Sequence, residues 1–216
     1  MRKQFAVIGL GRFGASVART LSSLGHDVLG IDISQCKVQS MINEITHAVQ
    51  ADAGEEETLK ALGIRNFDVV VIAIGNDLES NTLITAMLKE MGVKCVVAKA
   101  RSNLHGKVLA GIGADKIIYP EKDMGMRLAH NLVTSNVMDY IGLSPDYGVV
   151  EIIAPVKFIH KSLGELNLRA KYGISVMAIK KNGITIIVAP GADAVIEKND
   201  VLIIVSRNDI LEKLPR

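Results

Sequence analysis

The sequence predicts an α/β protein: a Rossmann-like, doubly wound, six-stranded parallel sheet, then a crossover helix and a small α+β domain. Two observations carry this prediction. An apolar run that begins at Phe5 stops at three glycines spaced G-x-G-x-x-G, and a helical pattern starts at once. A second apolar run, Val28 to Ile31, ends at Asp32, about 20 residues past the glycines. Strand, tight turn, helix and a second strand with an acid at its tip are the opening of a nucleotide-binding fold.

The glycine loop has a predicted role for each of its parts. Gly9 permits the turn, Gly11 lets the backbone approach a phosphate, and Gly14 lets the helix pack closely on the strand. The N–H groups at the start of the helix, with the helix dipole, form an anion site. Arg12 adds a guanidinium that can clamp phosphates. Asp32 is placed to accept hydrogen bonds from a ribose, and because no Arg adjoins it, NADP is the least expected nucleotide.

Short apolar runs alternate with helical patterns as far as Pro120, which is the order of βαβ units in a parallel sheet. The predicted strands are Phe5 to Ile8, Val28 to Ile31, His47 to Gln50, Val69 to Ile74, Cys95 to Ala98 and Lys116 to Tyr119. Six strands wound on both faces imply the order 3-2-1-4-5-6, with the ligand beyond the carboxyl ends of the strands.

Polar residues stand just past those predicted strand ends. They are Ser34, Asp52, Asn76, Lys99, Arg101 and Glu121, and His105 opens a helix nearby. The carboxyl ends of parallel strands share one edge, so we expect these residues around one cleft. Surface loops are polar without any ligand, and this plainer reading stays open for each of them.

The segment from Asp123 to Ile141 reads as one helix with two apolar stripes. Met124, Leu128 and Leu132 form one stripe, and the other contains Met126, Val133, Val137 and Tyr140. A helix with two apolar faces packs on a partner as well as on its own domain, so a crossover or dimer helix is predicted. The alternative is a helix buried within a single domain.

A turn or linker, Leu143 to Gly148, then opens a second domain. We expect a strand at Val149 to Ala154 and a short helix begun by an S-x-x-E capping box at Ser162 and Glu165. A hairpin of Ile174 to Ile179 and Ile184 to Val188 turns at Asn182-Gly183. A strand at Val201 to Val205 and a helix with Ile210, Leu211 and Leu214 complete a mixed or antiparallel unit.

Composition limits the classes of protein that remain. The 216 residues are 49% apolar, and the net charge of +2 is spread without a Lys/Arg block, which does not support nucleic-acid binding. The longest apolar runs are too short to span a bilayer, so a cytosolic protein is expected. Cys36 and Cys95 stand alone, which favours two ordinary thiols over a disulfide framework or a zinc site.

Catalytic groups are missing from the pattern. No Tyr-x-x-x-Lys occurs, and the five histidines are scattered without metal-ligand spacing. We therefore expect no catalytic residues and favour a sensor over an enzyme. A small NAD-dependent oxidoreductase remains the alternative, and turnover of NADH would distinguish it.

Over its full length the chain resembles the cytosolic regulatory subunits of bacterial potassium uptake systems of the Ktr/Trk type, built from RCK (TrkA_N and TrkA_C) domains. The segments that carry the resemblance are V-I-G-L-G-R-F-G at 7–14, D-I-S at 32–34, Asp52-Ala53, A-I-G-N at 73–76, G-A-D-K-I-I-Y-P-E-K-D-M-G at 113–125 and L-N-L-R-A-K-Y-G at 166–173. The run P-E-K-D-M-G is similar to the KtrA/KtrC branch.

The resemblance implies an RCK_N domain at residues 1–142, including the crossover helix at about 123–141, which binds ATP, ADP or NAD(H). It implies an RCK_C domain at residues 143–216 that in many members binds cyclic di-AMP, here near Arg169, Ile174 and Pro190. It further implies dimers assembled into an octameric ring. That ring would dock from the cytoplasm on the inner face of the membrane, on a potassium-translocating partner of the KtrB/KtrD or TrkH type.

The resemblance also implies which residues contact the nucleotide. They are Gly9, Gly11, Arg12, Phe13, Gly14, Asp32, Ile33, Ser34, Asp52, Ala53, Ile74, Gly75, Asn76, Lys99, Ala100, Arg101, His105 and Glu121. In the family Glu121 can reach the terminal phosphate across the dimer with a divalent cation, Mg²⁺ or Ca²⁺. Lys99 and Arg101 can equally be solvated.

Overall fold

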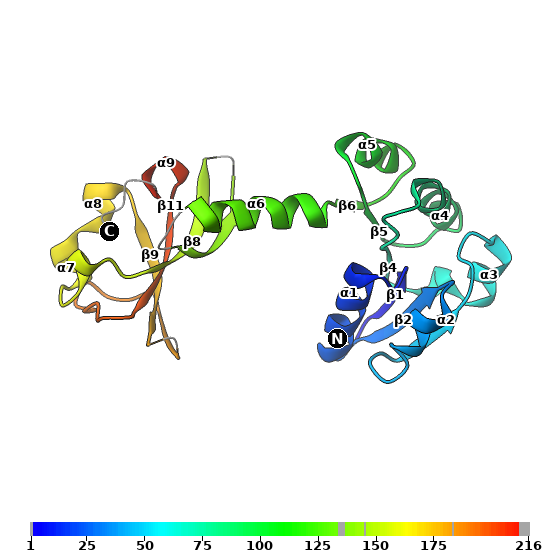
Figure 1. The fold of residues 1–216 in the computed structure, drawn as a ribbon, viewed down its shortest axis with the longest axis horizontal. Coiled ribbons are helices and arrows are strands. Elements are labelled where there is room, and N and C mark those ends of the chain that lie inside the picture. The colour runs from blue at the N-terminus through cyan, green and yellow to red at the C-terminus, as the bar shows by residue number, and fades with distance from the viewer. Residues whose placement is uncertain (1, 134–136, 145, 183, 212–216) are drawn as a thin grey trace. The chain divides into compact units, whose positions relative to one another are not determined.

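The computed structural model describes residues 2–133, 137–144, 146–182 and 184–211. The chain divides into two compact units, Met1–Pro120 and Glu121–Arg216 (Figure 1). Each unit has its own sheet and its own apolar core.

The first unit contains a six-stranded sheet in the order β3-β2-β1-β4-β5-β6, and every neighbouring pair is parallel. The strands are β1 Gln4–Ile8, β2 Asp27–Asp32, β3 His47–Gln50, β4 Val69–Ile72, β5 Val96–Lys99 and β6 Lys116–Ile118. The predicted order is therefore confirmed. The predicted fourth strand is two residues too long, because Ala73 and Ile74 already belong to the loop beyond β4.

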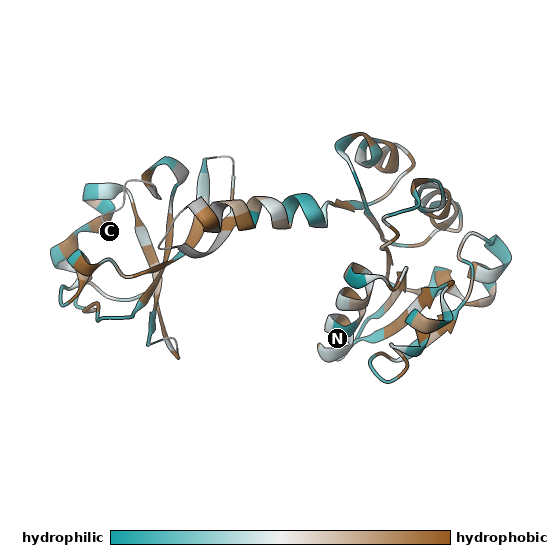
Figure 2. Cartoon of the chain, in the orientation of Figure 1, coloured by the Kyte–Doolittle hydropathy of each residue, from teal (hydrophilic) through white to brown (hydrophobic). Residues whose placement is uncertain are grey.

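Helices cover both faces of this sheet (Figure 1). They are α1 Arg12–Ser23, α2 Gln35–Gln39, α3 Glu56–Ala61, the 3-10 turn η1 Ile64–Asn66, α4 Leu78–Glu90 and α5 Asn103–Gly111. Successive side chains of a strand point to opposite faces. Accordingly, Ala6 and Ile8 of β1 pack in the cluster with α3, α4 and α5, whereas Val7 packs with α1 and α2. Strands buried on both faces are mostly apolar, and the strands of this sheet are largely brown in Figure 2.

The second unit begins with α6 Pro120–Val133 and contains an antiparallel sheet in the order β10-β9-β11-β8-β7. Its strands are β7 Val137–Gly142, β8 Tyr147–Ile153, β9 Ser175–Lys181, β10 Thr185–Val188 and β11 Val201–Arg207. The remaining elements are the 3-10 turn η2 Val156–Phe158 and the helices α7 Leu163–Leu166, α8 Leu168–Tyr172 and α9 Asn208–Leu211. The sheet is antiparallel, which settles one alternative left open by the sequence.

The predicted helix over 123–141 is wrong in its second half. Helix α6 ends at Val133, and Val137–Gly142 forms strand β7, which pairs antiparallel with β8. Val137 and Tyr140 therefore belong to a strand and form no helical stripe with Met126. The physical reason lies in Val137, Tyr140 and Ile141, since β-branched and aromatic residues favour a strand.

Two local predictions for the second unit are confirmed. Ser162 accepts from the Glu165 N–H (3.2 Å), and the Glu165 carboxylate accepts from the Ser162 N–H (2.7 Å), which is a complete capping box. Strands β9 and β10 pair as a hairpin around Asn182, whose φ is +48°. Gly183, and Leu214 of the predicted last helix, lie outside the described residues.

The contacts of residues 121–142 place them in the second unit, whereas the sequence assigned them to the first domain. The division of the two functional domains after residue 142 stays a prediction.

Candidate functional site

The glycine loop joins β1 to α1 and has the geometry that its spacing predicts. Gly9 has φ +93°, a left-handed conformation that favours glycine. A methyl group at Gly14 would clash with the Gly9 carbonyl oxygen and lie 2.9 Å from the Ala73 Cβ, so only glycine lets α1 approach the strands. Gly11 has no atom within 4 Å of the position of a Cβ, so its surroundings are open.

The start of helix α1 has a positive electrostatic potential that no acidic side chain of its first turn neutralises. Gly11 is its N-cap and supplies no side-chain acceptor, and the first turn contains no acidic residue. The first N–H groups of a helix have no intrahelical partner, and the dipole adds positive potential there. Arg12, in the same turn, is exposed. This end of the helix is therefore suited to an anion.

Asp32, the last residue of β2, is the centre of the site's hydrogen bonding. Its side chain is only 4% exposed. Oδ2 accepts from the Leu10 N–H at 2.7 Å, and Oδ1 accepts from the Ser34 N–H at 2.8 Å. The Lys37 ammonium lies 3.1 Å from Oδ2 and 3.3 Å from Oδ1. One carboxylate thus links the glycine loop, the loop after β2 and helix α2.

The loop after β4 is held by a buried asparagine of α4. Asn81, fully buried, donates through Nδ2 to the Ile74 carbonyl (2.7 Å) and to the Lys99 carbonyl (3.1 Å). It thereby ties the ends of β4 and β5 together. Asp77 caps the same helix by accepting from the Ser80 N–H, and the Ser80 hydrogen bonds lower the pKa of the Asp77 carboxyl.

Lys99, at the end of β5, reaches toward the glycine loop. Its ammonium lies 5.6 Å from the centroid of the Phe13 ring, a cation–π contact, and the residue is 9% exposed. A methyl group at Gly75 would lie 3.1 Å from Lys99 Nζ, so Gly75 makes room for this side chain. A positive charge therefore lies among the loops that follow β1, β4 and β5.

His105 lies under the loop after β5 and is 7% exposed. Its Nδ1 accepts from the Arg101 N–H at 3.3 Å, and its backbone N–H is capped by the Ser102 hydroxyl. Burial lowers the pKa of the imidazole, so the ring is neutral near pH 7 and carries its proton on Nε2. His105 Nε2 is a buried polar atom for which the described residues supply no hydrogen-bond partner.

All but one of the residues predicted to contact the nucleotide lie at the carboxyl edge of the first sheet. They follow β1 (Gly9, Gly11, Arg12, Phe13, Gly14), end or follow β2 (Asp32, Ile33, Ser34) and β3 (Asp52, Ala53), follow β4 (Ile74, Gly75, Asn76), or end or follow β5 (Lys99, Ala100, Arg101, His105). Contacts of Asp32, Asn81 and Lys99 join the groups after β1, β2, β4 and β5. Among the described residues, the Asp52 carboxylate accepts within its own turn, from the Gly54 N–H at 2.8 Å. Glu121 is exposed in the first turn of α6, in the second unit.

Sequence reasoning missed two residues of this site. Lys37 stands five residues after Asp32, and its only sequence signal was a cation close behind an acid. Nothing in the sequence indicates the role of Asn81, because a single polar residue on a helix is expected to be exposed to solvent. Only the fold shows that it is buried.

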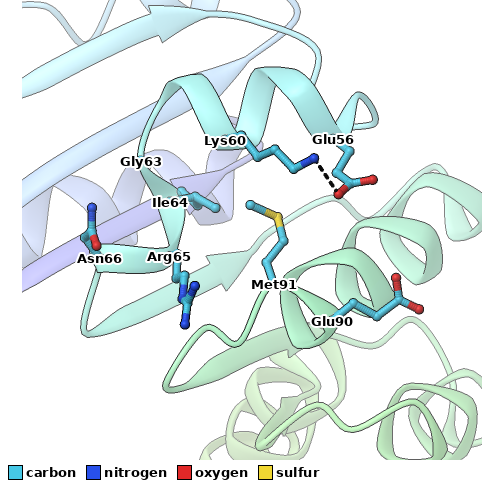
Figure 3. A pocket seen from close by; sticks show the side chains of 8 residues that line it. All are labelled: Glu56, Lys60, Gly63, Ile64, Arg65, Asn66, Glu90 and Met91. Carbon is cyan, nitrogen blue, oxygen red and sulfur yellow. Dashed lines mark ion pairs between the residues drawn. The ribbon is translucent and has the colours of Figure 1, made fainter.

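A surface pocket lies elsewhere in the first unit, between α3, η1 and the end of α4 (Figure 3). Its lining consists of Glu56, Lys60, Gly63, Ile64, Arg65, Asn66, Glu90 and Met91. These residues precede β4 and β5 and therefore lie at the amino edge of the sheet. The pocket shares no residue with the predicted site.

The described residues hold neither a metal-binding cluster nor a membrane-spanning helix. They contain no group of three or more His, Cys, Asp or Glu side chains placed to hold a metal. Nor does any helix among residues 2–133, 137–144, 146–182 and 184–211 have the length and apolarity to cross a bilayer.

The parallel 3-2-1-4-5-6 sheet, the glycine loop and the acid at the end of β2 define a Rossmann-type domain, here followed by a small antiparallel domain. The chain belongs to the TrkA family: residues 5–120 match the TrkA-N domain, and residues 149–215 match the TrkA-C domain. The family resemblance stated from the motifs is confirmed.

Characterised relatives extend over nearly the whole chain. The chain is 47% identical over 205 residues to Ktr system potassium uptake protein C of Bacillus subtilis, covering 95% of this chain and 92% of that protein. It is 46% identical over 211 residues to Ktr system potassium uptake protein A of the same organism, covering 98% and 95%. Among solved structures, the Kef C-terminal domain of Shewanella denitrificans in an AMP-bound form is 25% identical with a TM-score of 0.51, covering 61% of this chain and 77% of that one.

Gly14→Ala should destabilise the first unit by about 1–3 kcal/mol, because the new methyl group forces α1 away from β1 and β4. Gly11→Ala is the matched control, since its methyl group meets nothing and its φ of −67° suits alanine. Chemical denaturation measures both. Equal stability of the two variants would contradict the close-packing role of Gly14.

Proposed function

We propose that this protein is the cytosolic, ligand-sensing regulatory subunit of a potassium uptake system, and that its first unit binds an adenine nucleotide at the carboxyl edge of the sheet. One observation carries the proposal. The uncapped start of α1 and the buried Asp32 carboxylate are joined through a single loop by the Leu10 hydrogen bond. Hydrogen-bond donors for a phosphate and an acceptor for ribose hydroxyls are thereby held at a fixed spacing.

The phosphates would lie at the start of α1. There the space beside Gly11 is open, Arg12 supplies positive charge from the first turn of α1, and Lys99 supplies it from the end of β5. Fixed donors and cations around an anion stabilise it at little cost in reorganisation, since they are already ordered. ATP and ADP are the proposed ligands, and NAD(H) would present the same diphosphate.

The nucleoside would lie beyond Asp32. The carboxylate accepts ribose hydroxyls, and Ile33, with 69% of its side chain exposed, offers an apolar surface for the adenine. Asp52 and Ala53, after β3, adjoin this end of the cleft in sheet order. The AMP-bound Kef domain supports an adenine nucleotide in a fold of this kind.

Sensing is favoured over catalysis. The relatives are named as potassium uptake proteins, so the chain groups with transport proteins and not with oxidoreductases. His105 has a lowered pKa, a feature of some catalytic bases, but burial alone accounts for it.

Assembly follows from exposed apolar surface. Met124, Met126, Leu128 and Leu132 of α6 are 50–75% exposed. Apolar surface is stabilised by removal from water at about 25 cal/mol per Å². We propose a homodimer that uses α6, and an octameric ring of such dimers that docks on a potassium-translocating membrane subunit of the KtrB/KtrD or TrkH type at the inner face of the membrane.

Two further ligands are proposed. Glu121, at the start of α6, would bridge Mg²⁺ or Ca²⁺ to the terminal phosphate of ATP across the dimer, since hard cations prefer carboxylate and phosphate oxygens.

Cyclic di-AMP would bind at a two-fold interface of the C-terminal domains. There Arg169 is exposed and Pro190 half-buried, whereas the Ile174 side chain is buried in the core and could contribute only its backbone. Calorimetry with cyclic di-AMP and Arg169→Ala tests that site.

Arg12→Ala and Asp32→Ala should each weaken ADP binding by about 1.5–3 kcal/mol, the range for hydrogen bonds to charged groups. Arg19→Ala, on the same helix and exposed in an ion pair with Glu44, is the matched control. Isothermal titration of the purified chain measures all of them. Wild-type affinity in both site variants would refute the assigned cleft.

Leu128→Glu should lower the oligomeric mass, because a charge at the centre of the exposed α6 surface opposes its burial. Leu24→Glu, at a residue that is also exposed and lies at the end of α1, should leave the mass unchanged. Light scattering at micromolar concentration measures the oligomeric mass of the wild type and of both variants. A monomeric wild-type chain would refute the proposed assembly.

Glu121→Gln should reduce the difference between ATP and ADP more than it lowers the affinity for either, because only ATP presents the terminal phosphate that the carboxylate and cation bridge. By linkage, the two ligands can differ in effect only through their differential affinity for two ring conformations, typically about 1–3 kcal/mol. Potassium flux through the reconstituted system at saturating nucleotide is the measurement. An undiminished ATP-to-ADP ratio would show that Glu121 does not carry the signal.

A further inference from the structure

The Asp32 carboxylate is saturated with hydrogen bonds. It accepts from two backbone N–H groups, those of Leu10 and Ser34, and from the Lys37 ammonium, which lies within 3.3 Å of both oxygens. An ionised carboxylate has about four acceptor sites, two on each oxygen. One site on each oxygen is taken by a backbone donor, and Lys37 spans the remaining two.

A ribose diol requires those same two sites. Its 2′ and 3′ hydroxyls each donate one hydrogen bond, and a bidentate contact places one on each carboxylate oxygen. With all three donors in place, no acceptor site is left for either hydroxyl. One donor must leave before the ribose can bind in this way.

Lys37 is the donor that can leave. The Leu10 N–H belongs to the glycine loop and the Ser34 N–H to the tight turn after β2, so their loss would rearrange the backbone. The Lys37 side chain, by contrast, is 49% exposed on the short helix α2 and ends a flexible four-carbon stem. It can swing into water without disturbing the fold.

From this geometry we propose that Lys37 is a specificity-determining residue that occupies the ribose site in the empty protein and is displaced by the ribose diol. The inference rests on the proposed adenine-nucleotide function of the cleft. Lys37 keeps the buried carboxylate paired while the site is empty, because an unpaired buried charge is costly. It also lowers the affinity for a ribose diol relative to a ligand that leaves Lys37 in place, since only the diol has to displace the ammonium.

The competition between Lys37 and the ribose diol for the Asp32 carboxylate should change the affinity only modestly. Exposed ion pairs contribute about 0–1 kcal/mol, so removing this half-exposed partner should raise the affinity for a diol ligand by about two- to fivefold. A ligand with no ribose hydroxyls does not compete with Lys37 and should gain nothing from the substitution.

The test compares ADP with 2′,3′-dideoxy-ADP by isothermal titration of the full-length wild-type protein and Lys37→Met, which keeps most of the aliphatic stem. The two ligands carry the same phosphates, so the ratio of their affinities cancels the general effect of the lost positive charge. The ratio should rise about two- to fivefold in Lys37→Met. Lys60→Met, which removes a lysine from an exposed ion pair on α3, is the matched control and should leave the ratio unchanged.

The outcomes are distinct. A ratio that stays the same or falls in Lys37→Met, with wild-type binding intact, would overturn the displacement of Lys37 and leave the proposed function standing. Equal loss of affinity for both ligands, with the ratio unchanged, would show that Lys37 contacts the phosphates or the base. Absence of ADP binding by the wild-type protein would overturn the proposed function together with this inference.

Discussion

The close approach of α1 to the strands at Gly14 is the constraint on which the first unit depends. No side chain fits between Gly14 and the Gly9 carbonyl, so the start of the helix lies directly against the turn that follows β1. That distance decides where the uncapped N–H groups of α1 point and leaves the space above Gly11 open. An anion site of this kind therefore comes from backbone packing, and the charged side chains around it act on a geometry that is already fixed.

Asp32 extends the same constraint to the second strand. Its bond to the Leu10 N–H fixes the glycine loop from the β2 side, while Ala73 fixes it from the β4 side. The carboxylate is buried yet fully satisfied, which is the condition for a buried charge to be tolerated. The residue predicted to bind the ribose is therefore also a structural part of the empty protein. Substitutions at Asp32 should be judged by stability as well as by affinity, since they remove both functions at once.

Features that depend on local sequence patterns could be predicted from the sequence alone. The strand order follows from alternating apolar runs and helices, the roles of Gly9 and Gly14 follow from their spacing, and the capping box at Ser162 is visible in four residues. Strand β7 was predicted as a helix because the apolar residues of 137–141, on either side of Asp139, are compatible with both periods, and only the pairing with β8 decides. Lys37 and Asn81 were missed for a related reason. Both residues matter through contacts with residues that are brought near them only by the fold. Hydrophobic periodicity in the sequence does not indicate such contacts.

Hydrogen bonds of side chains and backbone hold the loops of the cleft to one another. Asn81 holds the ends of β4 and β5 through two hydrogen bonds, and the Arg101 N–H holds His105 through one. Each such bond contributes about 0.5–1.5 kcal/mol, so rearranging one or two of them costs about as much as the 1–3 kcal/mol typical of coupling between two sites. The Tyr119 hydroxyl fills the space where a side chain at Gly106 would lie, and the next residue, Pro120, begins α6. A change in the position of α5 would therefore act on Tyr119, and through the continuous backbone on the residue that starts the helix carrying Glu121.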